Sequence, residues 1–233
     1  MIDATWPRVS GWWREELAGD PSYEDTVTPL ALDLLREERV GTVLDVGCGE
    51  GRLSRALGRR GWSPIGVDID PSLLVTAAIP AVRLALPAGL VALRSEAFTA
   101  VVMSLVIEHI ADHDSLLRGL GRVTAPRGAM VVVANHPAFT APGSAPIDDG
   151  EEVLWRPGDY FSDGFTDEPA GGGTIRFHHR TMAELLTSAA QAGWALERLV
   201  EAGPSAPQID RYPPYADQRH IPRLLGVRWR KPG

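Results

Sequence analysis

Short runs of branched apolar residues alternate with amphipathic segments over the first 135 residues of this 233-residue chain. Runs rich in Val, Ile and Leu are typical of parallel strands that are buried on both faces of a sheet. They cover residues 42–46, 64–69, 81–86, 98–106 and 128–135. Helical patterns lie between them, over residues 52–60, 71–78 and 114–124. This alternation predicts a doubly wound, Rossmann-like α/β fold with right-handed crossovers.

The chain outside this alternating region has three parts. Residues 23–38 have the pattern of a helix that covers one edge of the sheet or the site. Residues 136–177 show no clear period and are rich in proline and glycine, which favours a functional lid over an ordinary loop. A helix is predicted over residues 180–193, followed by strands over 194–202 and 224–230 that close the sheet as a hairpin.

A glycine-rich turn follows the first predicted strand, in the sequence LDVGCGEGRL at residues 44–53. Such a turn lets a ligand lie against bare backbone at the carboxyl end of the sheet, where a helix also offers free N–H groups. Asp68 ends the second predicted strand, 19 positions after Gly49. An acid at this place can accept hydrogen bonds from ribose hydroxyls, so the sequence predicts a ligand that carries a ribose.

Asp45 narrows the choice of ligand. The glycine spacing is G-x-G-x-G, which differs from the G-x-G-x-x-G of dinucleotide-binding proteins. A carboxylate two residues before Gly47 is badly placed beside a pyrophosphate but well placed to accept from an ammonium group. A ligand with a ribose at one end and an amino-acid ammonium at the other is S-adenosylmethionine. A nicotinamide dinucleotide remains the less favoured alternative.

These motifs resemble those of the class I S-adenosylmethionine-dependent methyltransferases that act on small molecules. The segments VLDVGCGEGRLSRAL and GVDIDPSLL resemble the family's first two motifs, and FTAVVMSLVIEHIAD and GRVTAPRGAMVVV resemble its fourth and fifth strands. The resemblance covers about residues 40–135 and extends more loosely toward the C-terminus. It implies a seven-stranded, mostly parallel sheet with the last strand antiparallel.

The resemblance also implies a role for each matching residue. Asp45 would orient the methionine ammonium, Asp68 would hold the ribose, and Ile69 would press on the adenine face. The other implied cofactor-binding residues are Gly47, Cys48, Gly49, Gly51, Ser104 and Leu105. One departure concerns adenine, because the acid that often follows the third strand is absent until Glu96. Backbone or shape would then recognise the adenine.

A general base for an acceptor hydroxyl must stand at the carboxyl edge of the sheet. The candidates are His136, His178, His179 and His109. If residues 175–179 are extended, Phe177 shares one face with His179, and an inward-facing phenylalanine would favour His179 as the base. Aromatic residues of the lid predict a flat, partly apolar acceptor, and the predicted contacts are Trp155, Tyr160, Phe161 and Phe165.

Composition restricts the partners. The formal net charge is −7, which disfavours nucleic acid and anionic membranes. No apolar run is long enough to cross a bilayer, and Cys48 is the only cysteine, so a cytoplasmic protein is expected. The acidic run at residues 148–152 lacks a nearby histidine, so no metal is expected. Cys48 itself is interpreted as a buried filler and not a nucleophile.

The sequence therefore predicts one domain. Residues 1–39 would form an N-terminal helical cap, 40–135 the cofactor-binding core, 136–177 the acceptor lid, and 178–233 a C-terminal helix and strand hairpin. The predicted function is methyl transfer from S-adenosylmethionine, leaving S-adenosylhomocysteine, to an oxygen or nitrogen of a small aromatic or heterocyclic metabolite, such as one of secondary metabolism. The alternatives are a non-catalytic protein that binds S-adenosylmethionine and, less favoured, an NAD-type oxidoreductase. The oligomeric state is left open.

Overall fold

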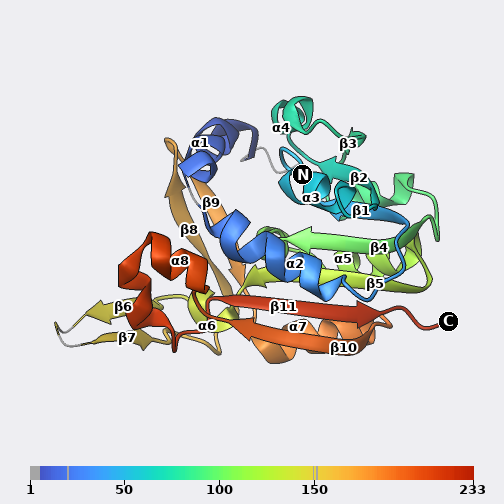
Figure 1. The fold of residues 1–233 in the computed structure, drawn as a ribbon. Coiled ribbons are helices and arrows are strands. Elements are labelled where there is room, and N and C mark those ends of the chain that lie inside the picture. The colour runs from blue at the N-terminus through green and yellow to red at the C-terminus, as the bar shows by residue number, and fades with distance from the viewer. Residues whose placement is uncertain (1–5, 20, 149, 151) are drawn as a thin grey trace.

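A seven-stranded sheet runs through the centre of the molecule (Figure 1). The computed structural model describes residues 6–19, 21–148, 150 and 152–233. The strand order is β10-β11-β5-β4-β1-β2-β3. The strands are β1 (Thr42–Val46), β2 (Ser63–Asp68), β3 (Ala81–Arg83), β4 (Phe98–Ser104), β5 (Thr124–Asn135), β10 (Ala195–Ala202) and β11 (Leu224–Arg230).

The direction of the strands confirms the predicted topology. β1 to β5 pair in parallel, whereas β11 pairs antiparallel with both β5 and β10. The predicted C-terminal hairpin is thus present as β10 and β11. The predicted third strand is shorter than its apolar run, because only residues 81–83 pair with β2.

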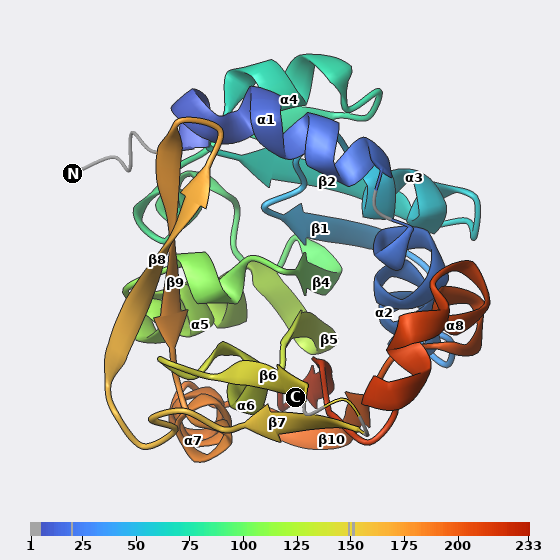
Figure 2. The ribbon, with the colours of Figure 1, turned by 90° about the vertical axis from the view of Figure 1, so that its left-hand side faces the viewer.

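Helices cover both faces of the sheet, which explains why its strands have no polar face (Figure 2). One face packs against α5 (His113–Val123) and α7 (Met182–Gln191), and the other against α2 (Thr28–Leu34) and α3 (Arg52–Gly58). In β4, Val101 and Met103 join the first core while Ala100 and Val102 join the second. A π-helical turn, η1 (Tyr23–Val27), leads into α2.

Several short helices complete the chain. In α4 (Pro71–Thr76), Pro71 lies in the first turn and Asp70 is the N-cap, with its side chain accepting from the Ser72 N–H. The remaining short elements are η2 (Ala88–Ala92), η3 (Ile107–His109), α6 (Pro137–Thr140), α8 (Ala206–Arg211) and η4 (Pro213–Gln218). None of the described helices is long and apolar enough to cross a membrane.

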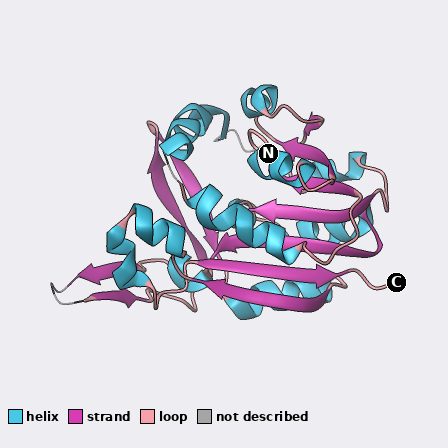
Figure 3. Ribbon diagram, viewed as in Figure 1, coloured by secondary structure: helices cyan, strands magenta, loops and turns pink. Residues whose placement is uncertain are grey.

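The segment after β5 is more regular than its sequence indicates (Figure 3). It forms two antiparallel hairpins, β6 (Ala145–Asp148) with β7 (Val153–Arg156), and β8 (Gly164–Ala170) with β9 (Gly173–His179). Pro146 lies in β6 and Pro169 in β8. Proline argues against a strand in a sequence, because it is tolerated mainly in edge strands, so these two residues conceal the strand pattern. The second hairpin continues two residues past the predicted end of the lid at 177.

The hairpin β8–β9 packs against α1 (Trp6–Gly19), far from it in sequence. Val9 of α1 forms a buried cluster with Ala170 and Ile175. Trp12 lies over Gly171, where an added side chain would collide with the indole. From here on, the lid means α1 together with β8–β9, and no longer residues 136–177, because these elements pack on each other beside the carboxyl end of the sheet (Figure 1).

Candidate active site

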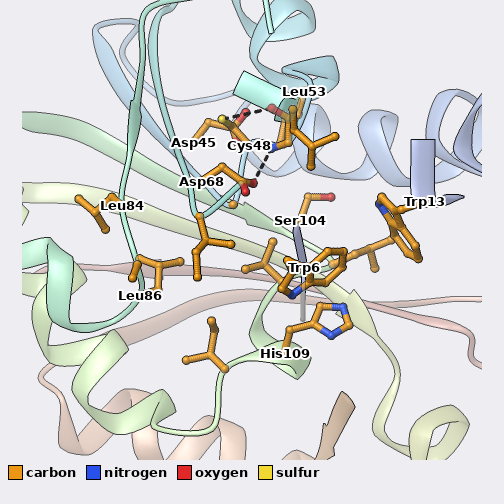
Figure 4. A pocket seen from close by; sticks show the side chains of 18 of the residues that line it. Trp6, Trp13, Asp45, Cys48, Leu53, Asp68, Leu84, Leu86, Ser104 and His109 are labelled. Carbon is orange, nitrogen blue, oxygen red and sulfur yellow. Dashed lines mark hydrogen bonds between the residues drawn. The ribbon is translucent and has the colours of Figure 1, made fainter. Parts of the chain in front are cut away.

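A cavity of about 650 Å³ opens where β1, β2 and β4 end (Figure 4). Its volume is in the range of pockets that hold small molecules and cofactors. The residues that line one part come from the sheet: Asp45, Gly47, Cys48, Gly49, Asp68, Ile69, Ser104 and Leu105. Those that line another part come from the lid and from η3: Trp6, Trp13, Asp167, Thr174, Arg176, His178 and His109.

The glycine turn bends sharply over the end of β2. The N–H groups of Gly47 and Cys48 both donate to the carbonyl of Val67, at 2.8 and 3.0 Å. Gly47, Gly49 and Gly51 all have positive φ, between 50° and 76°. A side chain at Gly47 would collide with Val106, whereas one at Gly49 would meet nothing closer than Leu73 at 4.0 Å. Packing therefore requires the first glycine, and the backbone at Gly49 faces open space.

Asp45 is buried at the base of the turn, with 2% of its surface exposed. Its Oδ2 accepts a hydrogen bond of 2.6 Å from the hydroxyl of Ser54. Burial raises the pKa of Asp45 to about 6, against the opposing effect of the Ser54 hydrogen bond, and the nearby Asp68 raises it further. A carboxylate that is costly to ionise gains most from a cation, so this site favours a positively charged ligand group.

Asp68 is held by the backbone on both sides. Its Oδ2 accepts from the Gly49 N–H at 2.8 Å, and its Oδ1 accepts from the Asp70 N–H at 2.9 Å. Burial raises its pKa, and these backbone hydrogen bonds oppose the rise. The carboxylate is therefore fixed in orientation at the end of β2, and it borders the cavity.

Cys48 borders the cavity beside Asp45 and Asp68, but its thiol is not activated as a nucleophile. Burial raises the pKa of its thiol, and the carboxylates of Asp45 and Asp68 raise it further. A thiol kept protonated is a poor nucleophile. This agrees with the interpretation of Cys48 as a filler, and its Sγ also occupies the space that a side chain at Gly66 would need.

Apolar residues line the cavity where the family often has an acid. Leu84, Ala85, Leu86 and Pro87 border it after β3, together with Ile69 after β2. Glu96, the first acid after β3, is elsewhere, in an ion pair of 3.3 Å with Lys231. Adenine recognition by shape or backbone groups therefore stays a prediction for this part of the cavity.

Two of the four candidate histidines line the cavity and two do not. His109 and His178 line the cavity. His136 and His179 are buried outside its lining: His136 lies 2.8 Å from Glu201, and His179 lies 2.9 Å from the carbonyl of Tyr160. Thr174, Arg176 and His178 form the cavity face of β9, so the face shared by Phe177 and His179 is not the one that borders the cavity. The preference for His179 is corrected accordingly.

The four aromatic residues that were predicted to contact the acceptor lie outside the cavity lining. None of the four described side chains lines the cavity. Trp155 stacks on Phe139, and Phe161 is 89% exposed. The Tyr160 hydroxyl accepts a hydrogen bond of 3.0 Å from the Met182 N–H. Phe165 supports the Arg176 guanidinium, 3.6 Å above its ring. Trp6 and Trp13 instead supply the aromatic wall, in edge-to-face contact at 5.6 Å (Figure 4).

Some lining residues carried too weak a sequence signal to be selected. Tyr23 and Thr28 reach the cavity from η1 and α2, and Asp167 and Arg176 reach it from the lid. Asp167 and Arg176 are cross-strand partners joined by two hydrogen bonds of 2.8 Å. The described residues contain no group of three or more His, Cys, Asp or Glu side chains that could hold a metal, and Asp149 and Glu151 of the acidic run lie outside the description.

Comparison with known proteins identifies the core. A family model described as "Methyltransferase domain" matches residues 44–132. A crystal structure of an S-adenosylmethionine-dependent methyltransferase from Mesorhizobium loti is similar over 92% of this chain and 100% of that chain, with a TM-score of 0.77 and 26% identity. Residues 44–132 form a class I S-adenosylmethionine-dependent methyltransferase domain.

Other similar proteins match different shares of this chain. A ubiquinone biosynthesis O-methyltransferase of Hahella chejuensis is 30% identical over 126 residues, which are 49% of this chain and 52% of that protein. The chain thus spans about half the length of this relative. A solved [4+2]-cyclase, SpnF, is similar in fold to this chain, with a TM-score of 0.60 and 19% identity over 89% of this chain and 81% of that one.

The residues of the methyltransferase domain fit S-adenosylmethionine. The open backbone at Gly49 leaves room for the ligand, and the fixed Asp68 carboxylate suits ribose hydroxyls. The buried Asp45 suits the ammonium, and the apolar residues from Leu84 to Pro87 suit the adenine. When bound, this cofactor supplies a methyl group on an electrophilic sulfonium.

Replacing Asp68 should weaken cofactor binding. Asp68→Ala removes charge-assisted hydrogen bonds, each worth about 1.5–3 kcal/mol, so we expect the affinity for S-adenosylhomocysteine to fall at least about tenfold. Titration calorimetry measures this. Asp70→Ala is the matched control, because Asp70 is also buried and bonded to backbone but does not line the cavity. Equal losses in both variants would show that Asp68 acts only by holding the turn.

Proposed function

We propose that this protein transfers a methyl group from S-adenosylmethionine to a hydroxyl of a small aromatic acceptor. The observation that carries the proposal is a single cavity that joins two kinds of wall. The cofactor motifs line one part, and two tryptophans and two histidines line another. A cofactor-binding protein without an acceptor would have no need for the second wall.

The chemistry of the second wall favours an aromatic hydroxyl compound. Trp6 and Trp13 present large apolar surfaces on which a flat ring can pack. Burial lowers the pKa of His178, and the charges of Arg180 and Arg176 lower it further, so this imidazole is neutral at pH 7. Neutral imidazoles can accept the proton of a hydroxyl. The name of the Hahella relative, an O-methyltransferase, also supports oxygen as the methylated atom.

The residues of this chain have separate tasks in such a reaction. The glycine turn, Asp45 and Asp68 would hold the cofactor in one orientation. The aromatic wall would position the acceptor, because the reacting atoms must be about 3–3.5 Å apart and aligned. The lid would exclude water from the cavity during transfer.

Two measurements test the proposal in order. Titration with S-adenosylhomocysteine and with NAD separates the methyltransferase from the oxidoreductase alternative. Incubation with methyl-labelled S-adenosylmethionine and a panel of phenols, catechols and N-heterocycles then detects products that are heavier by one methyl group. Binding of S-adenosylhomocysteine without transfer to any compound would favour the non-catalytic alternative. The cyclase SpnF shows that a shared fold does not decide between these activities.

A further inference from the structure

His109 lies at the point where the lid meets the sheet. It ends η3, directly after β4, and borders the cavity below Ser104 and Trp6 (Figure 4). Its ring packs against Trp6 of α1, with centroids 5.0 Å apart, and against Phe177 of β9, with centroids 4.6 Å apart. Both elements of the lid therefore hold this one imidazole.

The lid also makes a hydrogen bond that sets the tautomer of His109. Its Nδ1 lies 2.9 Å from the backbone carbonyl oxygen of Arg176 in β9. A carbonyl oxygen can only accept, so Nδ1 must carry the proton. In a neutral imidazole the lone pair is then on Nε2.

The other histidines do not offer this combination. His136 Nδ1 accepts from the Ala138 N–H at 3.1 Å, so its Nε2 must donate to Glu201, and no lone pair is left. His179 Nε2 must donate to the carbonyl of Tyr160, and its Nδ1 is buried outside the cavity. His178 also borders the cavity, but it belongs to β9 of the lid, so its ring moves with the lid and does not gain the Arg176 carbonyl on closure.

We propose that His109 is the general base for the acceptor hydroxyl, and that closure of the lid selects the tautomer that makes it one. The inference rests on the proposed methyl transfer. The acceptor oxygen gives its proton to Nε2 as it gains the methyl group, and the electron pair of the broken carbon–sulfur bond stays on sulfur. The resulting imidazolium still donates from Nδ1 to the Arg176 carbonyl, and its extra proton leaves to water when the lid opens.

In this arrangement, closing the lid and fixing the Nδ1–H tautomer of His109 happen together. Val9, Ala170 and Ile175 fasten α1 to the hairpin, so the Trp6 contact and the Arg176 carbonyl reach His109 together. With the lid open, His109 loses the acceptor that fixes Nδ1–H and its two tautomers can exchange. The base is then complete only when water is excluded, which limits loss of the methyl group to solvent.

The tautomer can be measured without an acceptor. The full-length protein is labelled with ¹⁵N-histidine and saturated with S-adenosylhomocysteine at pH 8, and long-range ¹H–¹⁵N spectra distinguish the two ring nitrogens. His109→Gln assigns the signal. We expect His109 to be protonated at Nδ1 and not at Nε2. A dominant Nε2–H form would overturn the inference.

Loosening the lid tests the coupling. Ile175→Ala removes buried side-chain volume between α1 and the hairpin, and Ile221→Ala is the control, since Ile221 is equally buried but lies outside the lid and the cavity lining. We expect Ile175→Ala to give averaged His109 nitrogen signals and to lower the transfer rate at least about tenfold, with S-adenosylhomocysteine affinity within twofold of wild type. Fixed Nδ1–H signals in Ile175→Ala would refute the coupling.

The role as base is tested by the pH dependence of the rate, with a catechol from the panel as acceptor. We expect His109→Gln to lower kcat by about 10²–10⁴ and to abolish the acidic limb of the profile, while S-adenosylhomocysteine still binds. The limb should persist in His178→Gln. The reverse pattern would assign the base to His178 and overturn the inference. Failure of the wild type to bind S-adenosylhomocysteine would instead overturn the proposed function.

Discussion

Asp45→Asn should stabilise the free protein while weakening its affinity for the cofactor about 100-fold. The ordinary pKa of this carboxyl is 3.8, and burial raises it to about 6. At 1.36 kcal/mol for each pKa unit, ionised Asp45 costs the folded state about 3 kcal/mol at neutral pH. Asparagine carries no charge and can still accept from the Ser54 hydroxyl, so the variant avoids this cost.

The stability gained by Asp45→Asn should depend on pH. Because the folded-state pKa is raised, the folded state binds the proton more tightly than the unfolded chain. The favourable effect of this protonation is fully present below pH 3.8 and is lost as the pH rises through about 6. The gain from Asp45→Asn should therefore be largest above pH 6 and shrink toward pH 4. Urea unfolding at pH 7.5 and pH 5 measures it, with the exposed Asp217→Asn as control.

Cofactor binding should change in the opposite direction. A charge-assisted hydrogen bond from the ammonium to Asp45 is worth about 1.5–3 kcal/mol, which the variant loses. In the wild type, affinity should also fall as the pH drops below about 6, because Asp45 then takes up a proton. A variant that is no more stable than wild type at pH 7.5, or that binds S-adenosylhomocysteine equally well, would contradict this account of Asp45.

The residues on the cofactor side of the cavity come from short, contiguous segments of the sequence, so their positions could be predicted. Asp45, the glycine turn and Asp68 are each fixed by the strand that precedes them, so one strand–turn–helix pattern predicts that they converge. The structure places these residues, with Ile69, Ser104 and Leu105, along one cavity. The sheet is equally predictable, since alternate residues of β4 enter two different cores.

The acceptor side could not be predicted in the same way. It is built by α1 and β8–β9, which are more than 140 residues apart and meet through Val9, Ala170 and Ile175. Residues 175–179 were expected to turn their phenylalanine face toward the site. Phe177 instead packs on His109, and the polar face with Arg176 and His178 borders the cavity. The apolar face of β9 is buried, but it packs against α1 and η3, so sequence polarity identifies the packed face and not the face that borders the cavity.

Gly51→Ala should cost the fold far more than Gly49→Ala, although the two residues share one turn. Their φ values are +76° and +50°, and a positive φ costs a residue with a side chain about 1–2 kcal/mol. A Cβ at Gly51 would also lie 2.6 Å from the Ala77 carbonyl oxygen, a backbone atom that cannot easily move. We therefore expect a loss of about 3 kcal/mol or more for Gly51→Ala, read from urea unfolding.

Gly49→Ala should separate binding from stability. Its new methyl group has no neighbour closer than Leu73 at 4.0 Å, so the unfolding free energy should fall only by the cost of the positive φ. Gly143→Ala measures that cost alone, because Gly143 has φ +74° and nothing within 4 Å of an added Cβ. Gly49 borders the cavity, so the methyl group should hinder a ligand that lies on this backbone and reduce S-adenosylhomocysteine affinity about tenfold. Wild-type affinity in Gly49→Ala would mean that the cofactor does not approach the turn here, and a mild effect of Gly51→Ala would mean that α4 can shift to accept it.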